Sequence, residues 1–415
     1  MRIQRALAVA AWGGYFNDDL AAIRAGATKD GFSYIGQPVT PGFETIRHPT
    51  EAASIVLILD NGQVVVGDAL TVQYAGAGGR VRRFQHREQI LALREVCEYL
   101  EGLKVSRFLS MCADLEAQEF GDLALNRTAA HYGVSQALLL AVAAEQGKTG
   151  AEVLAEELGT SVSSKLVPIN VQCGEDRRNG VDKAILRCAD VLPHGLVNSL
   201  KIVGDYGDKL QDYVSWIVSR IRDIGAEDYQ PEIHIDVYGL LGTIFDHDAD
   251  RITAYIADLA ERAAPLSFCI ETPVLMDSRA AQIEMFGSIR AKLRTLGSSA
   301  QLIVDEWAND LDDIRAFVES GATDMINVKS PDLGSICNAA QAVIECRKGR
   351  VRPILGGSSN DSDQSGRVIC HVALATQPAW VLARPGMGVD EGYQIVHNEM
   401  SRILAIIEAM STKNS

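Results

Sequence analysis

The feature that most constrains the fold is a regular alternation of short apolar runs and amphipathic segments after about residue 160. The apolar runs recur at intervals of roughly thirty residues, about eight times, which is typical of parallel strands joined by helices in a closed α/β barrel. Segments 209–225 and 249–264 are two of the amphipathic helices. A doubly wound sheet is the alternative, but no GxGxxG motif follows the first strand of this region. The predicted strands lie at 165–173, 189–198, 232–239, 266–273, 301–307, 325–331, 352–358 and 379–386.

The chain before this alternation mixes strands with helices. Residues 54–70 form two β-rich runs around an Asp-Asn-Gly triplet, which predicts a hairpin. Segments 86–118 and 126–157 have helical periodicity. Strands followed by helices predict an α+β unit.

The N-terminal stretch MRIQRALAVAAWGGYFNDD is predicted as a first strand. It resembles a signal peptide only weakly, because its apolar part is short and no small-residue cleavage site follows. We therefore expect a TIM-like α/β barrel over residues 161–415, preceded by an α+β capping domain over residues 1–160.

Composition excludes several classes of function. A net charge of −15 argues against nucleic acid as a partner, because phosphate binding needs surplus Lys and Arg. The longest apolar run, at 137–144, is too short to span a membrane. Eight cysteines without a CxxC pair indicate reduced, mostly buried thiols. We expect a soluble cytoplasmic protein.

Several predicted strands end in a polar residue. Asp236, Glu271, Asp305 and Lys329 follow one another at spacings of 35, 34 and 24 residues, about one strand–helix repeat each. Equivalent positions on successive barrel strands converge at the carboxyl-terminal rim. Of the neighbours Asp305 and Glu306 only one can face the interior, and alternation along the strand favours Asp305.

Three carboxylates close together repel one another, so either they bind protons or a cation lies between them. Oxygen ligands without nearby Cys or His favour a hard ion, Mg²⁺ before Mn²⁺ or Ca²⁺. The structural alternative is that each acid caps the following helix, which for a single acid is the more common case. Three acids in one register favour the metal site.

Lys329 then has a predicted role as a base. Beside a divalent cation its ammonium is disfavoured, so its pKa is expected to fall towards neutrality. The alternative is a lysine that pairs with an acid for structure. His194 ends another strand and is a candidate for the opposite side of the barrel mouth, although a single histidine is more often a packing residue. A metal with such a base suits proton abstraction next to a carboxylate, with the carbanion stabilised as an enediolate, followed by β-elimination or reprotonation.

The motifs HIDVYG, CIETP, VDEW, VKSPDLG and ARPGMGVDEG resemble the methylaspartate ammonia-lyases of the enolase superfamily. The resemblance extends along the whole chain, including GGYFNDDLAAIRAG, DGFSYIGQPVT and VQYAGAGGR. It implies a homodimer that uses Mg²⁺, with a monovalent cation such as K⁺ as a helper. The family interconverts 3-methylaspartate, a small amino-dicarboxylate, with mesaconate and ammonia.

The resemblance also implies individual roles. Asp236, Glu271 and Asp305 would be the Mg²⁺ ligands, and Lys329 would remove the C3 proton of the L-threo substrate. His194 would be the acid–base group on the opposite face and would contact a substrate carboxylate. The other implied substrate contacts are Gln73, Gln172, Asn327, Ser358, Ser359 and Leu382.

Three positions differ from the usual family residues. Asn170 stands where a phenylalanine is usual, Ile354 where a tyrosine is usual, and Asn327 where a glutamine is usual. We expect these changes to alter the pocket for the side chain and carboxylates, so a different 3-substituted aspartate or another amino acid is an alternative substrate. A racemase or dehydratase of the superfamily is a second hypothesis, although Asn327 breaks the KxK pair typical of that branch. A non-catalytic amino-acid-binding barrel is a third, but it would not need both Lys329 and His194.

Overall fold

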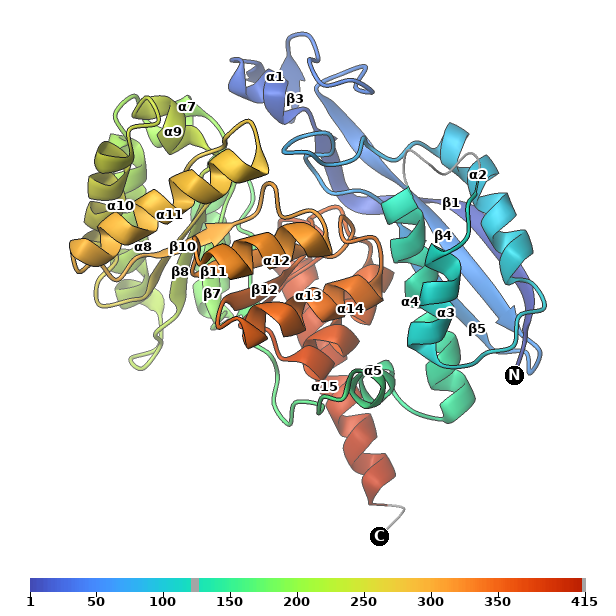
Figure 1. The fold of residues 1–415 in the computed structure, drawn as a ribbon. Helices are drawn as coiled ribbons and strands as arrows, with labels where there is room; N and C mark the ends of the chain where they lie inside the picture. Colours follow the sequence, from blue (N-terminus) through green and yellow to red (C-terminus); the bar gives the residue numbers. More distant parts are fainter. Residues whose placement is uncertain (121–126, 413–415) are drawn as a thin grey trace.

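The computed structural model describes residues 1–120 and 127–412, which form two lobes (Figure 1). The N-terminal lobe contains an antiparallel sheet of three strands in the order β1-β4-β5. Both the first strand and the hairpin are confirmed. The strands are β1 (Ile3–Asp18), β4 (Arg47–Leu59) and β5 (Val64–Ala69), and a small extension carries α1 (Leu20–Arg24), β2 (Thr28–Asp30) and β3 (Ser33–Ile35).

Helices cover one face of this sheet (Figure 1). Helix α4 packs closely on β5 because glycines face each other there: a Cβ on Gly67 would lie 2.1 Å from the carbonyl oxygen of Gly133. The predicted helical regions are confirmed, although residue 126 lies outside the described residues. They contain α2 (His86–Leu100), α3 (Phe108–Glu116), α4 (Arg127–Gln146) and α5 (Gly150–Leu158).

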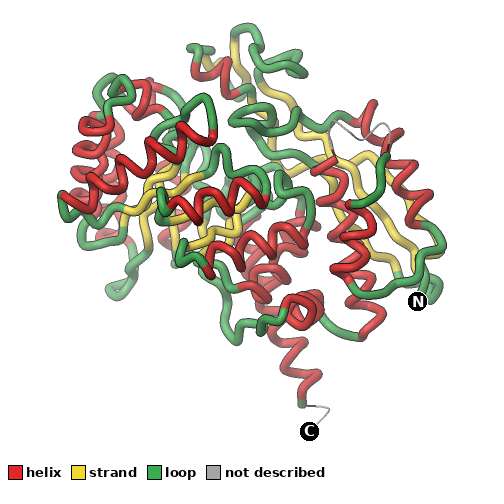
Figure 2. Tube along the Cα trace, viewed as in Figure 1, coloured by secondary structure: helices red, strands yellow, loops and turns green. Residues whose placement is uncertain are grey.

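The second lobe is a closed barrel of eight parallel strands, so the prediction of a barrel over a doubly wound sheet is confirmed. Figure 2 shows the strands in the centre with helices around them. Every predicted strand of this region contains one barrel strand. These are β6 (Ile169–Asn170), β7 (Val191–His194), β8 (Glu232–Asp236), β9 (Phe268–Glu271), β10 (Gln301–Val304), β11 (Met325–Lys329), β12 (Arg352–Gly356) and β13 (Trp380–Leu382).

Helices surround the barrel, and α8 shows how an amphipathic one packs against it. In α8, the buried residues Leu210, Val214, Ile217 and Ile221 recur every three or four positions, which places them on one face. Asp248 is the N-cap of helix α10, and its carboxylate accepts backbone N–H groups of the first turn. The helices are α6 (Arg177–Leu186), α7 (Leu200–Val203), α8 (Asp208–Ile224), α9 (Leu240–Ile244), α10 (Ala249–Ala263), α11 (Arg279–Thr295), α12 (Leu311–Ser320), α13 (Ile336–Lys348), α14 (Asp363–Thr376) and α15 (Asp390–Ser411).

The barrel interior is apolar at one level and polar above it. Its buried apolar cluster is made of inward-facing side chains from six different strands. Towards the carboxyl ends of the strands the interior becomes polar, and this polar part forms the candidate site. The apolar cluster contains Val191, Cys269, Ile303, Met325, Ile354 and Trp380.

The two lobes are joined through the loop and helix that follow β12. Helix α5 packs on α14, and Tyr132 of α4 donates a hydrogen bond of 2.9 Å to Asp361. The Gly14 N–H donates to the Asn360 carbonyl at 3.0 Å, and a Cβ on Gly14 would clash with Pro385 at 2.3 Å. We propose the division into a capping domain, 1–160, and a barrel domain, 161–415.

Two further expectations concern the chain as a whole. All eight cysteines are free, and six of them are buried. Within the ranges that the structure describes, no helix is both long and apolar enough to cross a membrane.

Two buried histidines make the stability depend on pH. Burial lowers the pKa of His131 and of His371 to about 4, below the ordinary value of about 6.5. Because the unfolded chain binds these protons more readily, the free energy of unfolding should fall as pH drops from about 6.5 towards 4. Urea unfolding at a series of pH values measures this slope, and His131→Asn or His371→Asn should each remove part of it. A slope unchanged in both variants would contradict the assignment.

Candidate active site

Three carboxylates meet at the carboxyl-terminal rim of neighbouring strands β8, β9 and β10. Asp236 and Glu271 are direct partners in the β8–β9 pairing, and Asp305 follows the last residue of β10. One oxygen from each of the three lies within 4.8 Å of the others. All three side chains are buried. The register predicted from the sequence therefore brings these groups together.

Asp305, and not Glu306, faces the other two carboxylates. Glu306 accepts a hydrogen bond from the Thr272 hydroxyl at 2.5 Å instead. The guanidinium of Arg80, from the capping domain, contacts Asp305 at 2.9 Å, Asp332 at 2.9 Å and Glu306 at 3.4 Å. Arg80 was not expected from the sequence, because no local pattern around this residue indicates which barrel strand its side chain contacts.

Lys329 ends β11 and lies beside the carboxylates. Its Nζ is 3.0 Å from Asp305 Oδ2, and 14% of its side chain is exposed. Burial disfavours the ammonium, but the negative charge of Asp305, with smaller contributions from Glu271 and Glu306, raises the pKa of Lys329 overall. The negative charges of the protein therefore outweigh burial at this lysine, and the fall of its pKa beside a bound divalent cation stays a prediction.

His194 ends β7, which is four strands away from β11 in the eight-stranded barrel. It thus lies across the mouth from Lys329, as expected. Its Nε2 is 3.6 Å from Asp236 and 3.9 Å from Glu271. Burial, followed by the neighbouring His234, lowers the pKa of His194 to about 3, so its imidazole is neutral near pH 7.

One small cavity connects most of the predicted substrate contacts. It is closed by the capping domain through Gln73, whose backbone N–H donates to Ser358 at 2.8 Å and whose side-chain oxygen accepts from Ser359 at 3.3 Å. Gln172 Nε2 and His194 Nδ1 are buried and have no hydrogen-bond partner within the described part of the chain. The cavity lining includes Gln73, Arg80, Gln172, His194, Lys329, Ser358, Ser359 and Leu382.

His234 is a further residue of the site that the sequence interpretation missed. It precedes Asp236 by two positions, so both side chains point into the barrel, and this period of two could have revealed it. The Asn170 amide donates to His234 Nδ1 at 2.8 Å, which assigns the proton to Nε2. That Nε2 donates to Glu271 at 2.6 Å and is therefore not available as a metal ligand.

The three unusual residues are not among those that line the cavity. Asn170 bonds to His234, and Asn327 donates its amide to Glu271 at 2.7 Å. Ile354 belongs to the apolar cluster of the barrel. The effect of these changes on the pocket for the substrate's side chain and carboxylates stays a prediction. Asn327 contacts a carboxylate of the site, and its role towards a substrate stays a prediction.

The carboxylate group fits a hard divalent cation. Burial and then the charge of Glu271 raise the pKa of Asp236 well above its ordinary value, so the protein alone does not compensate this carboxylate. Three oxygen donors without sulfur match the preference of Mg²⁺.

His234 should matter for metal affinity because it holds Glu271 in place. Changing His234→Gln is expected to weaken Mg²⁺ binding by about 10- to 100-fold, the usual effect of losing a partner that orients a ligand. Isothermal titration of the variant with Mg²⁺ measures this. His247→Gln, at an exposed position outside the barrel interior, is the control. Equal affinities in both variants would contradict this role.

Fold and site together define a member of the enolase superfamily: a capped α/β barrel whose strands carry three carboxylates and a lysine at their carboxyl ends. The model of the methylaspartate ammonia-lyase N-terminus matches residues 1–159, and that of the methylaspartate ammonia-lyase C-terminus matches residues 161–409. The chain belongs to the methylaspartate ammonia-lyase family.

Individual relatives agree over the full length. Methylaspartate ammonia-lyase 1 of Carboxydothermus hydrogenoformans is 44% identical over 98% of this chain and 97% of its own. The structure of the Citrobacter amalonaticus methylaspartate ammonia-lyase containing (2S,3S)-3-methylaspartic acid has a TM-score of 0.94 and 42% identity, covering 98% of this chain and 100% of that one. A magnesium complex of β-methylaspartase from Clostridium tetanomorphum has a TM-score of 0.91 and 39% identity, covering 99% and 100%. These relatives favour the ammonia-lyase over the racemase or dehydratase hypothesis.

Proposed function

We propose that the protein is a carbon–nitrogen lyase that removes the C3 proton of 3-methylaspartate, or of a close 3-substituted aspartate, and eliminates ammonia to give a mesaconate-type product. One observation carries this proposal: a lysine and a neutral histidine face each other across three buried carboxylates in one cavity. Elimination next to a carboxylate needs a base that reaches the neighbouring C–H and a positive charge at the carboxylate, and a second group can serve the opposite face of the substrate.

Asp236, Glu271 and Asp305 would hold Mg²⁺. When bound, the ion supplies the positive charge that makes the carbon next to a substrate carboxylate acidic. Mn²⁺ as a substitute and a monovalent cation such as K⁺ as a helper stay predictions. Homodimer formation and a cytoplasmic location also stay predictions.

Lys329 is proposed to take the C3 proton. To act as a base its Nζ must first be neutral, and the carboxylate of Asp305 at 3.0 Å is the nearest group that stabilises its charged form. Once the charge of Asp305 is compensated, burial favours the neutral amine. The C3–H bond then breaks, and the proton passes to Nζ while its electron pair stays on the substrate.

His194 is proposed to act on the opposite face. Its neutral imidazole can accept a proton and return it, and its unpartnered Nδ1 is available for a hydrogen bond. In the elimination the C2–N bond breaks, ammonia leaves with the electron pair of that bond, and a C2–C3 double bond forms. Gln73, Gln172, Ser358 and Ser359 offer hydrogen bonds to the substrate, and Leu382 offers an apolar wall for its alkyl group.

The test is direct. Purified protein with Mg²⁺ should convert (2S,3S)-3-methylaspartate into an unsaturated diacid and should release one ammonia for each diacid. Ultraviolet absorbance measures the diacid. A panel with hydrogen, methyl or ethyl at C3 should give the highest kcat/KM for methyl. If none of the panel yields ammonia and an unsaturated diacid, the proposed function is wrong.

A further inference from the structure

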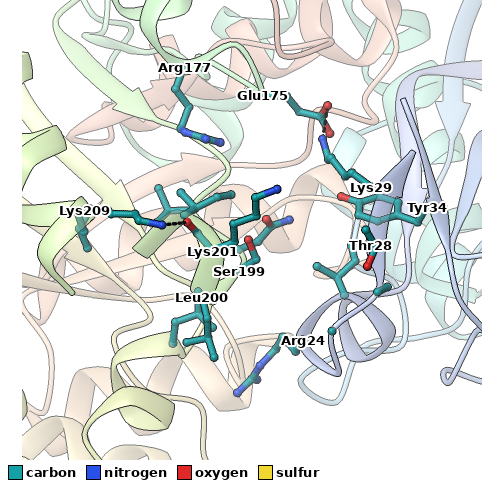
Figure 3. Close-up of a pocket in the computed structure, with 18 of the residues that line it drawn as sticks. Arg24, Thr28, Lys29, Tyr34, Glu175, Arg177, Ser199, Leu200, Lys201 and Lys209 are labelled. Carbon is teal, nitrogen blue, oxygen red and sulfur yellow. Dashed lines mark hydrogen bonds and ion pairs between the residues drawn. The ribbon is translucent and has the colours of Figure 1, made fainter. Parts of the chain in front are cut away.

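A second and much larger cavity, of about 1110 Å³, lies between the two domains. The capping domain contributes residues 23–29 and Tyr34 to its lining, and the barrel contributes loops and helices after β6, β7 and β8. Figure 3 shows side chains from both domains pointing into it. We call it the basic cavity because of the side chains that line it.

Six cationic side chains and two acidic ones line the basic cavity. One of the acids, Glu175, is already paired with Lys29 and, at 2.9 Å, with Arg47. The other, Asp176, accepts a hydrogen bond from Asn179 at 2.6 Å. Among the residues that the structure describes, none of the remaining five cations forms an ion pair with a carboxylate. These are Arg24, Arg177, Arg178, Lys201 and Lys209.

The hydrogen bonds of these cations go to uncharged groups. Arg24 donates to the Thr243 hydroxyl at 3.3 Å, Arg177 to a backbone carbonyl at 3.2 Å, and Lys209 to the carbonyl of Lys201 at 3.1 Å. In contrast, the buried cations Arg47 and Arg80 are paired with carboxylates. Arg24 thereby links the two domains, and the guanidinium of Arg178 lies over the Trp216 ring, but neither contact neutralises a charge, so the positive charge of the basic cavity is left for an anionic ligand.

This positive charge stands out because the chain as a whole carries a net charge of −15. An acidic molecule repels a dicarboxylate at a distance. A concave surface lined by charges of the opposite sign concentrates such an anion locally and raises its association rate.

Only a thin wall separates the basic cavity from the active-site cavity. Asn198 lines the basic cavity and donates a hydrogen bond of 3.0 Å to the hydroxyl of Tyr74, which lines the active-site cavity. Tyr74 packs edge-to-face on Tyr238 with ring centroids 5.2 Å apart. Gln172 lines the active-site cavity, and Glu175, three residues further on, lines the basic cavity.

We propose that the dicarboxylate substrate binds first in the basic cavity and then enters the active site behind Tyr74. The dicarboxylate product leaves the active site through the same cavity. This inference rests on the proposed function, which defines both molecules as small dicarboxylates. The five cations without a carboxylate partner bind the anion weakly in the basic cavity, and the elimination takes place in the active-site cavity.

The experiment compares two double variants of the full-length enzyme. Lys201→Gln with Lys209→Gln removes two charges from the basic cavity. Lys104→Gln with Lys165→Gln removes two charges from exposed positions outside it, so both variants lower the net charge equally. At low ionic strength the first pair should lower kcat/KM for (2S,3S)-3-methylaspartate by about 3- to 10-fold through a higher KM, whereas the second should stay within a factor of about two. Added salt should reduce the difference.

Equal kcat/KM in the two double variants would overturn this inference while the activity of the wild-type enzyme still supports the proposed function. An inactive wild-type enzyme would overturn the proposed function, and this inference with it. The single variant Arg24→Gln tests the same charge from the capping domain and should also raise KM, with unchanged circular dichroism as the check of folding. An unchanged KM in this variant would count against the inference.

Discussion

Lys329→Ala is expected to lower kcat for (2S,3S)-3-methylaspartate by about 10²- to 10⁴-fold, because no other amine lies at this side of the carboxylates in the described structure. The loss should appear in both elimination and exchange of the C3 proton with deuterium from solvent. Mass spectrometry of recovered substrate measures the exchange, and diacid absorbance measures the elimination.

The variant should remain folded and should bind Mg²⁺ at least as tightly as the wild type. The ammonium of Lys329 lies 3.0 Å from Asp305 and competes there for the carboxylate, so its removal frees a ligand oxygen. Lys104→Ala, in the capping domain, serves as the control. Near-normal kcat in Lys329→Ala would show that another group removes the proton.

Removing the divalent ion is expected to lower the rate by at least about 10³-fold, since polarisation of a carboxylate by a metal lowers the activation free energy by several kcal/mol. Protein dialysed against EDTA should be inactive and should recover on addition of Mg²⁺. Undiminished turnover after complete removal of metal would exclude the ion from the reaction.

Replacing one carboxylate ligand separates the role of the ion from the other effects of a chelator. Asp236→Asn keeps the shape of the side chain but removes one negative charge, so it should raise the Mg²⁺ concentration required for half-maximal activity. Asp246→Asn, at an exposed position, is the matched control. The same requirement for Mg²⁺ in both variants would remove Asp236 from the ligand set.

The barrel and the grouping of its acids could be predicted from the sequence because both follow from one repeat. Residues that end successive parallel strands must meet at one rim, so the spacing of Asp236, Glu271 and Asp305 was sufficient. The choice of Asp305 over Glu306 needed only the alternation of side chains along a strand. The same alternation places His234 under Asp236, so that omission was avoidable.

Other parts of the site depend on distances that no local pattern contains. The pKa of Lys329 is a sum over several charges, and among them the carboxylate of Asp305 at 3.0 Å raises it most. Arg80 lies 225 positions before Asp305 in the chain, and the pairing arises only when the domains dock. The depth of Asn170 and Asn327 likewise depends on which layer of the barrel each strand residue reaches.

The docking of Arg80 has a consequence for how the enzyme could be divided. Each domain contributes to one cluster of charges: the barrel supplies a surplus of acids, and the cap supplies a guanidinium that offsets part of it. A barrel separated from the cap would lose the guanidinium that contacts Asp305, Glu306 and Asp332. These carboxylates would then bind protons or cations from solution more readily. Adding the separate cap should return Arg80 to them and reverse this change.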